Sequence, residues 1–317
     1  MSPRIGFTLV THDKPAQFLR LTRRLSELFP DAPIACHHDF SKTPLNGLEF
    51  PACVQFVRPY LVTQWGQFSV VLAFRAALRL LYSWPDPPDW FVSLGGSDYP
   101  VRAPADVLRD LETGGADAYL VHELVQYPSR PDPKVEQTAQ EIASREWCSM
   151  IYGRYIATRL WLPGFSVSRR KPVKIRIVRP PWKIMERWLT PFGSNFRCYT
   201  GEFCIAANRR AAEALLADSP ANRKLDRHFK KRPNPDEALI HTVLCNHPGL
   251  RVSPANLRYI DWSTEGPHPK LLAMEDLPRI FASGAHFARK FDWESGQPVL
   301  DAIDAQVDRA VAAQPVR

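Results

Sequence analysis

Strand-like and helix-like segments alternate over the first 125 residues, and this alternation restricts the chain to few folds. Apolar, β-rich runs occupy 5–10, 32–38, 54–57, 89–94 and 118–122. Between them, apolar residues recur at helical spacing in 16–29, 68–82 and 105–111. Strands joined by helices pack as a parallel sheet with crossover connections. We therefore predict an α/β fold with a mainly parallel central sheet flanked by helices.

The rest of the chain is less regular. Residues 126–190 are rich in Pro and Arg and predict long loops. Further on, the pattern predicts a strand and helix over 200–217, a helix over 235–244, a strand within 250–260, a short helix over 276–282 and a loosely held helix from about 301. A chain of 317 residues that is 45% hydrophobic can form one large domain. We expect a single domain over 1–300 and a tail over 301–317.

Several classes of protein are disfavoured by composition. No run of about 18 apolar residues predicts a membrane-spanning helix, and the N-terminal residues lead directly into a strand without a signal segment. The six cysteines are scattered and form no CxxC pair, so they predict neither a disulfide scaffold nor a zinc site. We expect a protein of the reducing cytoplasm.

Positive charge is concentrated in two segments. Residues 169–187 carry a net charge of +7 and residues 223–232 carry +5, so the rest of the chain carries −4 of the total +8. Such local potential suits an anionic ligand such as a pyrophosphate, or an anionic membrane surface. Two solvated basic loops would explain the same pattern. Nucleic-acid binding is disfavoured because no recognised binding module accompanies the basic runs.

Polar clusters follow three of the predicted strands. They are Thr11-His12-Asp13, His37-His38-Asp39 and Ser97-Asp98. Ligands of parallel α/β sheets bind beyond the carboxyl ends of the strands, which is where these clusters fall. Their coincidence predicts a ligand site at this edge of the sheet.

Glu237 lies in Asn234-Pro235-Asp236-Glu237, a pattern that admits two interpretations. Asn followed three residues later by Glu is typical of a capping box, so Glu237 could simply cap a helix. A carboxylate at a helix N-terminus is also kept ionised, and at a cleft it can serve as a general base.

Three cations and two tryptophans are further candidates. Arg258, Arg289 and Lys290 could stabilise a diphosphate, or could pair on the surface with Asp261 and Asp292. The aromatic side chains of Trp65 and Trp262 could stack on a sugar or a base, or could be core residues.

No metal site is evident in the sequence. A hard cation needs several oxygen ligands, yet none of the nineteen aspartates lies two residues from another. Ser97-Asp98 offers one carboxylate, and consecutive residues 36–39 of a strand point to opposite faces. There is also no GxSxG, P-loop or GxGxxG motif. If a diphosphate is bound, cationic side chains must replace the metal.

Together these residues resemble the core-2/I-branching β-1,6-N-acetylglucosaminyltransferase and peptide O-xylosyltransferase family, glycosyltransferase family 14. The matching pieces run in the family's order over residues 5–292: His12-Asp13-Lys14-Pro15, His38-Asp39-Phe40-Ser41-Lys42, Thr63-Gln64-Trp65-Gly66, Leu94-Gly95-Gly96-Ser97-Asp98-Tyr99-Pro100-Val101, Pro235-Asp236-Glu237, Arg258-Tyr259-Ile260-Asp261-Trp262 and Phe287-Ala288-Arg289-Lys290-Phe291-Asp292.

The resemblance implies a GT-A-type nucleotide-sugar-binding fold. It also implies an inverting, metal-independent reaction that transfers GlcNAc or xylose from a UDP-sugar and needs no cofactor. It implies that Glu237 is the general base. It assigns donor binding to His12, Asp39, Ser97, Asp98, Arg258, Arg289 and Lys290. It also divides the domain into a nucleotide-binding half (1–125), an irregular basic region (126–190) and an acceptor and catalytic half (191–300).

One departure concerns the acceptor. Where the family has Gly-Ser-x-Trp, this chain has Gly201-Glu202-Phe203-Cys204. We assign acceptor binding to Trp65, Glu202 and Trp262, with a glycan, a lipid-linked sugar or a protein as acceptor. The sequence predicts no membrane anchor, and this fits a bacterial-type member of the family. We therefore expect a cytoplasmic protein that could contact the inner face of an anionic membrane around Trp182. A catalytically inactive carbohydrate- or nucleotide-binding protein on the same fold is the alternative.

Overall fold

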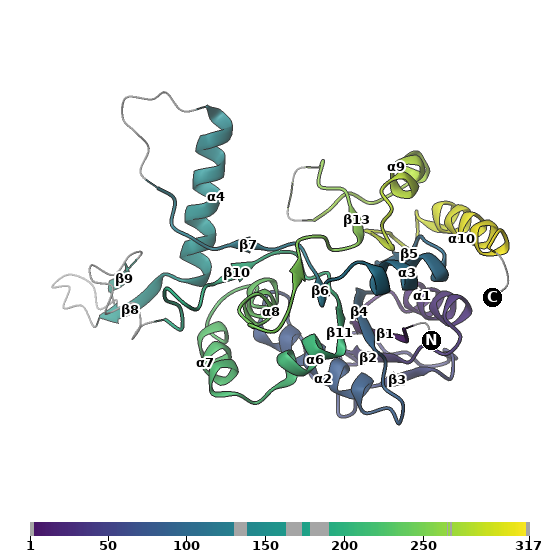
Figure 1. The fold of residues 1–317 in the computed structure, drawn as a ribbon, viewed down its shortest axis with the longest axis horizontal. Coiled ribbons are helices and arrows are strands. Elements are labelled where there is room, and N and C mark those ends of the chain that lie inside the picture. Colours follow the sequence, from purple (N-terminus) through teal and green to yellow (C-terminus); the bar gives the residue numbers. More distant parts are fainter. Residues whose placement is uncertain are drawn as a thin grey trace.

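A seven-stranded sheet forms the centre of the structure, a computed structural model that describes residues 3–129, 138–162, 173–177, 190–264, 266 and 268–314 (Figure 1). Its strands, in spatial order, are β12 (Val252–Ser253), β6 (Ala118–Tyr119), β11 (Ala206–Asn208), β4 (Trp90–Gly95), β1 (Ile5–Thr11), β2 (Ile34–His38) and β3 (Val54–Phe56). Neighbouring strands are parallel except at β11, which runs antiparallel to β4 and β6. The predicted α/β class with a mainly parallel sheet is confirmed.

Helices cover both faces of this sheet. One apolar cluster joins the sheet to α1 (Pro15–Leu28), α3 (Pro104–Thr113), α9 (Leu277–Ala282) and α10 (Gln297–Ala312). The other joins it to α2 (Phe68–Tyr82), α6 (Arg209–Leu216), α7 (Pro220–Phe229) and α8 (Asp236–Cys245). Side chains alternate between the two clusters along β2, where Ile34 and Cys36 enter the first and Ala35 the second.

A smaller sheet lies beside the carboxyl end of β4. It contains β13 (Arg258–Ile260), β14 (Phe287–Arg289) and β5 (Tyr99–Pro100), in that order. β13 and β14 are parallel, with Ile260 opposite Arg289, while β5 is antiparallel to β14. Because β5 directly follows the loop after β4, this sheet brings Arg258 and Arg289 to that loop. A two-stranded pair, β7 (Glu123–Leu124) with β10 (Tyr199–Thr200), lies nearby.

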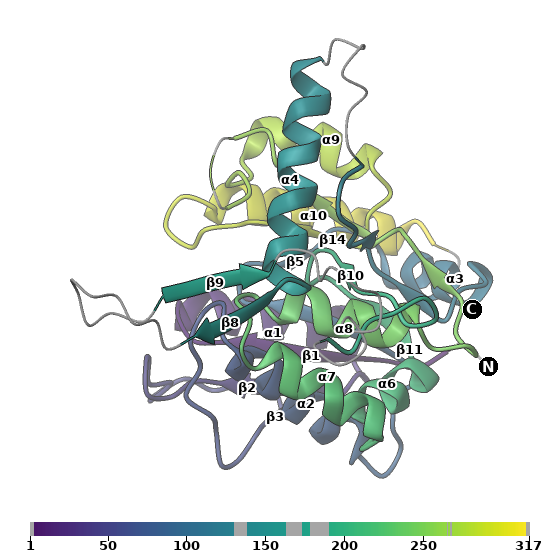
Figure 2. The same cartoon turned by 90° about the vertical axis from the view of Figure 1, so that its left-hand side faces the viewer.

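A long helix projects from the region that the sequence predicts to be irregular. α4 (Ala139–Tyr155) extends away from the body of the protein (Figures 1 and 2). A capping box of Thr138 and Glu141 starts it, and its last turn is buried in the second cluster through Ile151 and Tyr155. The prediction of an irregular region with long loops is therefore wrong for residues 139–155, which form this helix. β8 (Thr158–Leu162) and β9 (Val173–Ile177) follow as an antiparallel pair.

The two basic segments have different outcomes. Apart from 173–177, the segment 169–187 lies outside the described residues, and so does Trp182. Most of the segment 223–232 belongs to α7, where Leu225 and Phe229 are buried. It is therefore largely a helix with one apolar face, rather than a basic loop.

The C-terminal helix is packed, although the sequence predicts a loosely held one. Val299, Ile303 and Val307 recur every fourth residue on α10 and are buried against the first cluster. Ion pairs also connect α10 to α1, because Arg24 of α1 pairs with Asp304 at 2.9 Å and with Asp308 at 2.7 Å. The short predicted helix at 276–282 is confirmed as η1 (Met274–Asp276) running into α9. None of the helices in the described ranges is long and apolar enough to cross a bilayer.

Candidate active site

The three predicted polar clusters come together at one edge of the sheet. The hydroxyl of Thr11 lies 2.9 Å from Nδ1 of His38, and the N–H of Asp39 donates to the carbonyl of Thr11 at 3.0 Å. The loop after β4 lies beside Thr11, because a Cβ atom at Gly96 would be 3.6 Å from Cγ2 of Thr11. The carbonyl of Ser97 in this loop accepts from the N–H of Phe291 at 3.0 Å. His12 is exposed and Ser97 is half-buried. The predicted ligand edge therefore exists as a continuous group of loops.

Asp39 lies inside these loops and not on their surface. Its fully buried carboxylate accepts four hydrogen bonds, from the N–H and hydroxyl groups of Ser41 and of Thr63. Burial alone would raise the pKa of Asp39, but these hydrogen bonds outweigh it and lower the pKa to about 2. The carboxylate thus holds the loop at Thr63 in place, and direct contact of Asp39 with a nucleoside stays a prediction.

Asp98 is paired with two arginines. Its Oδ2 lies 2.6 Å from Nη1 of Arg258 and also accepts from the N–H of Gly95, while its Oδ1 lies 3.4 Å from Nε of Arg289. The side chains of Asp98 and Arg258 are 1% and 2% exposed. The charge of Asp98 raises the pKa of Arg289 above its ordinary value. Asp98 is therefore a buried counter-ion, and the cluster of Asp98, Arg258 and Arg289 carries a net positive charge.

Lys290 extends this positive region. The residue is half-buried and its backbone carbonyl accepts from the N–H of Leu272, but its ammonium forms no hydrogen bond or ion pair with the described residues. Asp292 pairs with Lys14 instead, and Asp261 lies 4.0 Å from Arg279. The alternative in which Asp261 and Asp292 neutralise the site cations is therefore wrong.

Glu237 does not close the capping box that its local sequence predicts. The N–H of Asn234, which Glu237 would accept from, donates to the carbonyl of Gly66 at 2.8 Å, and Asn234 has a φ of 48°. The cap position of α8 is Pro235, without a side-chain cap. The capping interpretation is wrong because a loop from the other half of the chain takes the group that Glu237 would have capped.

The carboxylate of Glu237 instead has three polar neighbours. Tyr155 donates to Oε2 at 3.1 Å, Asn234 donates to Oε1 at 3.2 Å, and Nη1 of Arg154 lies 3.5 Å from Oε2. The side chain of Glu237 is 36% exposed, so the oriented carboxylate remains accessible. This is the arrangement that a general base needs.

Arg154 and Tyr155 were missed from the sequence. They end α4, in the region predicted to be irregular. The capping box at Thr138 and the helical spacing of Ile151 and Tyr155 could have revealed the helix. No local signal places its last turn beside Glu237, because that contact depends on the packing of α4 against α8.

A short segment connects Glu237 to the cationic cluster. The N–H of Gly201 donates to the carbonyl of Glu237 at 2.9 Å, and Nη1 of Arg289 lies 3.7 Å from the sulfur of Cys204. A side chain at Gly201 would lie 2.0 Å from the carbonyl oxygen of Val121, so only glycine fits this close approach. Residues 201–204 therefore contact both the backbone of the candidate base and the guanidinium of Arg289.

Both predicted tryptophans are at the surface. Trp65 is 71% exposed and Trp262 is 51% exposed, so the alternative in which they are core residues is wrong. Trp65 precedes Gly66, which holds Asn234 beside Glu237. The indole N–H of Trp262 donates to Glu202 at 2.6 Å. All three predicted acceptor residues are thus linked to the surroundings of Glu237.

Asp236, next to the candidate base, gives the protein a pH-dependent stability. Its Oδ1 is buried without a hydrogen-bond partner in the described parts of the chain. Burial and the charge of Glu237 raise the pKa of Asp236 from 3.8 to about 7. Between these values the folded state binds more protons than the unfolded state, so the free energy of unfolding falls as the pH rises through this window.

We expect Asp236→Asn to remove this pH-dependent decrease in the free energy of unfolding. Urea unfolding should show a gain of a few kcal/mol at pH 8, because each pKa unit corresponds to ~1.4 kcal/mol, and little change at pH 4. Asp218→Asn, in a side chain that is 81% exposed, is the matched control. An equal effect of Asp236→Asn at both pH values would contradict the assignment.

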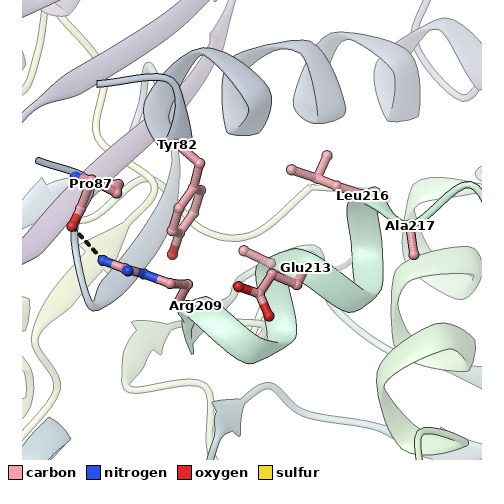
Figure 3. Close-up of a pocket in the computed structure, with 7 residues that line it drawn as sticks. Tyr82, Pro87, Arg209, Glu213, Leu216 and Ala217 are labelled. Atoms are coloured by element: carbon pink, nitrogen blue, oxygen red, sulfur yellow. Dashed lines mark hydrogen bonds between the residues drawn. The ribbon is translucent and has the colours of Figure 1, made fainter. Parts of the chain in front are cut away.

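A separate hollow lies at the opposite edge of the sheet. It has a volume of about 460 Å³ and is lined by Tyr82, Pro87, Arg209, Ala212, Glu213, Leu216 and Ala217 (Figure 3). Asn208, which precedes Arg209, pairs with Trp90 at the amino end of β4. The hollow is therefore remote from the loops at the carboxyl ends, and none of the predicted site residues lines it.

Comparison with known proteins identifies a family match in the second half of the chain. The family model of the core-2/I-branching enzymes matches residues 162–281, a range that contains Glu202, Glu237 and Arg258. Over this range the chain is similar to the core-2/I-branching enzymes. The family match begins after α4, so it does not include Arg154 and Tyr155.

Two curated relatives of this chain come from Arabidopsis thaliana. The β-glucuronosyltransferase GlcAT14A is 26% identical over 253 residues, which cover 78% of this chain and 48% of the relative. The β-glucuronosyltransferase GlcAT14B is 25% identical over 307 residues, which cover 90% and 62%. The chain thus spans about half to three fifths of the length of these relatives.

One solved structure also resembles this chain. It is the galactosyltransferase LgtC in complex with donor and acceptor sugar analogs, which covers 98% of this chain and is covered to 97% by it. The identity is 10% and the TM-score is 0.37, which is too low to carry an argument about the fold. The α/β class rests on the strand order above, and the GT-A type stays a prediction of the family resemblance.

Among the described residues, no three His, Cys, Asp or Glu side chains are grouped so that they could hold a metal ion. At the one position where the sequence offers a candidate, Asp98 is already bound by arginines. Metal independence nevertheless stays a prediction.

Proposed function

We propose that this chain is an inverting glycosyltransferase that moves a sugar from a UDP-sugar to an acceptor hydroxyl without a divalent metal. The supporting observation is the placement of residues 201–204, which contact Glu237 at one end and Arg289 at the other. An accessible, oriented carboxylate is thereby linked to a cationic cluster, as transfer from a nucleoside diphosphate requires.

In this mechanism Glu237 accepts the proton of the acceptor hydroxyl while that oxygen attacks the anomeric carbon. The bond from the anomeric carbon to the diphosphate oxygen breaks, UDP leaves with the bonding electrons, and the configuration inverts. Tyr155 and Asn234 hold the carboxylate of Glu237 in place. Arg289 and Lys290 stabilise the charge that grows on the leaving diphosphate. Arg258 is buried and contributes through its ion pair with Asp98.

Three donors are supported, two by the family resemblance and one by the names of the relatives. UDP-GlcNAc and UDP-xylose are the donors that the resemblance implies, and the names of the two plant relatives add UDP-glucuronic acid. We propose a glycan, a lipid-linked sugar or a protein as the acceptor.

The test is UDP release by the purified chain from each of these three donors, with and without candidate acceptors. We expect release and a product of the matching mass, both unaffected by EDTA. A strict requirement for Mn²⁺ would overturn the metal-free mechanism. UDP binding without release from any donor would support the inactive binding protein instead.

Lys290→Ala should weaken UDP binding by roughly 10- to 100-fold, because a hydrogen bond to a charged group contributes about 1.5–3 kcal/mol. Isothermal titration calorimetry with UDP measures this directly. Lys224→Ala on α7 removes the same charge from an exposed position and should leave the affinity unchanged. Equal affinities of wild type and Lys290→Ala would remove Lys290 from the donor site.

We also propose that the chain acts in the cytoplasm, in contact with the inner face of the membrane. The large exposed side chains Ile142, Trp147 and Met150 of α4 support this, as does the basic segment 169–187 that follows. Co-sedimentation should occur with anionic vesicles and not with neutral ones. Binding that does not depend on anionic lipid would contradict the proposal.

A further inference from the structure

The carboxylate of Glu202 bridges the two ends of β13. Its Oε1 accepts from Nε1 of Trp262 at 2.6 Å, and its Oε2 accepts from Nδ2 of Asn256 at 2.7 Å. Asn256 precedes β13 and Trp262 follows it. Hydrogen bonds to a carboxylate are the stronger kind, so both ends of the strand are firmly held.

The orientation of Asn256 is determined independently. Its Oδ1 accepts from the N–H of Arg258 at 3.0 Å, so its amide nitrogen must point toward Glu202. A carboxylate can accept both bonds, one on each oxygen. A glutamine at position 202 would present an NH₂ group to one of the two donors and could satisfy only the other.

The backbone around Glu202 is attached to the helix of the candidate base. Gly201 and the hydroxyl of Thr200 both donate to the carbonyl of Glu237, at 2.9 and 3.0 Å. Nε2 of the buried His241, also on α8, lies 3.1 Å from the carbonyl of Glu202. Because a carbonyl only accepts, His241 donates here. The backbone of Glu202 is therefore held by α8, while its side chain holds Trp262.

We infer that Glu202 is a positioning residue that sets the place of the Trp262 indole relative to Glu237, and thereby orients the acceptor sugar. The inference rests on the proposed transfer reaction. With 51% of its surface exposed, Trp262 offers an aromatic face on which a sugar ring can stack. A sugar stacked there presents one particular hydroxyl to Glu237, so the Glu202–Trp262 bond controls both acceptor affinity and the linkage formed.

The first experiment measures transfer by Glu202→Gln, which retains the size of the side chain. The Michaelis constant for the acceptor should rise by about tenfold, the scale of one lost hydrogen bond to a charged group. The Michaelis constant for the donor should not change. Glu213→Gln, an exposed glutamate at the opposite edge of the sheet, is the matched control. A parallel rise in both constants would show a general structural role and overturn the inference.

Trp262→Phe provides the second variant, since it removes the indole N–H but keeps an aromatic ring. If Glu202 acts through Trp262, the double variant that combines Glu202→Gln with Trp262→Phe should bind the acceptor no worse than Trp262→Phe alone. Additive losses would overturn the inference.

A third measurement does not depend on activity. The accessibility of Trp262 to acrylamide is obtained as the difference in fluorescence quenching between each protein and its Trp262→Phe counterpart. We expect greater quenching of Trp262 in Glu202→Gln than in wild type or Glu213→Gln. Unchanged quenching would overturn the positioning role even if transfer occurs. Greater quenching in a protein without transfer would support that role while refuting the proposed reaction.

Discussion

Glu237→Gln should lower kcat by roughly 10²-fold or more, the scale expected when a positioned general base is lost. Glutamine has almost the same volume and can still accept from Tyr155, but it cannot take a proton from the acceptor hydroxyl. UDP binding should be unaffected, because the cationic cluster lies at the other end of residues 201–204. The effect should therefore appear in kcat and not in the affinity for UDP.

Initial rates of UDP release with saturating donor and acceptor measure this loss. Calorimetry with UDP and thermal unfolding confirm that the variant is folded and binds. Glu213→Gln serves again as the control, because it makes the same chemical change far from the loops at the carboxyl ends. Turnover by Glu237→Gln at the wild-type rate would refute its assignment as the base.

Asp98→Ala should destabilise the protein by about 3–5 kcal/mol, because removing one partner of a buried ion pair leaves the other charge uncompensated. The side chain of Arg258 is 2% exposed and relies on Asp98 for its closest charged contact, at 2.6 Å. Arg289 would lose its counter-ion as well. The free energy of unfolding in urea measures the change.

The control is an ion pair at the surface. Asp218 and Arg223 are 2.8 Å apart, but their side chains are 81% and 54% exposed. Asp218→Ala should therefore change the stability by at most about 1 kcal/mol. If Asp98→Ala were no more destabilising than Asp218→Ala, the buried cluster would not hold the loop after β4 in place.

Local patterns were sufficient for the architecture of the first 125 residues. The alternation of β-rich runs and helical spacing predicted β1, α1, β2, β3, α2 and β4, and the parallel pairing of β1 with β2 and β4 followed from it. Because parallel strands end at the same edge, the polar residues after them had to gather there. The convergence of Thr11, Asp39 and Ser97 was therefore predictable from the sequence.

The same reasoning failed where structure depends on packing. α4 lies in a segment without a strong apolar stripe, and its buried positions are confined to its last turn. α10 has an apolar stripe, but the ion pairs of Arg20 and Arg24 with Asp304 connect residues at the two ends of the chain. Neither contact has a signature within a window of a few residues.

Glu237 separates the two kinds of information most clearly. The sequence by itself determined that a carboxylate would stand at the start of a helix, since Asn, Pro and two acids precede an apolar run. Only the tertiary structure decided what that carboxylate does. Gly66 takes the N–H that a capping box would have used, while Tyr155 and Arg154 approach from α4. Likewise, the sequence supplied the cations, but burial decided that Arg258 would be neutralised by Asp98 and that Lys290 would not. Helix and strand preferences act over neighbouring residues, whereas the partner of a charged group is set by whichever distant segment folds against it.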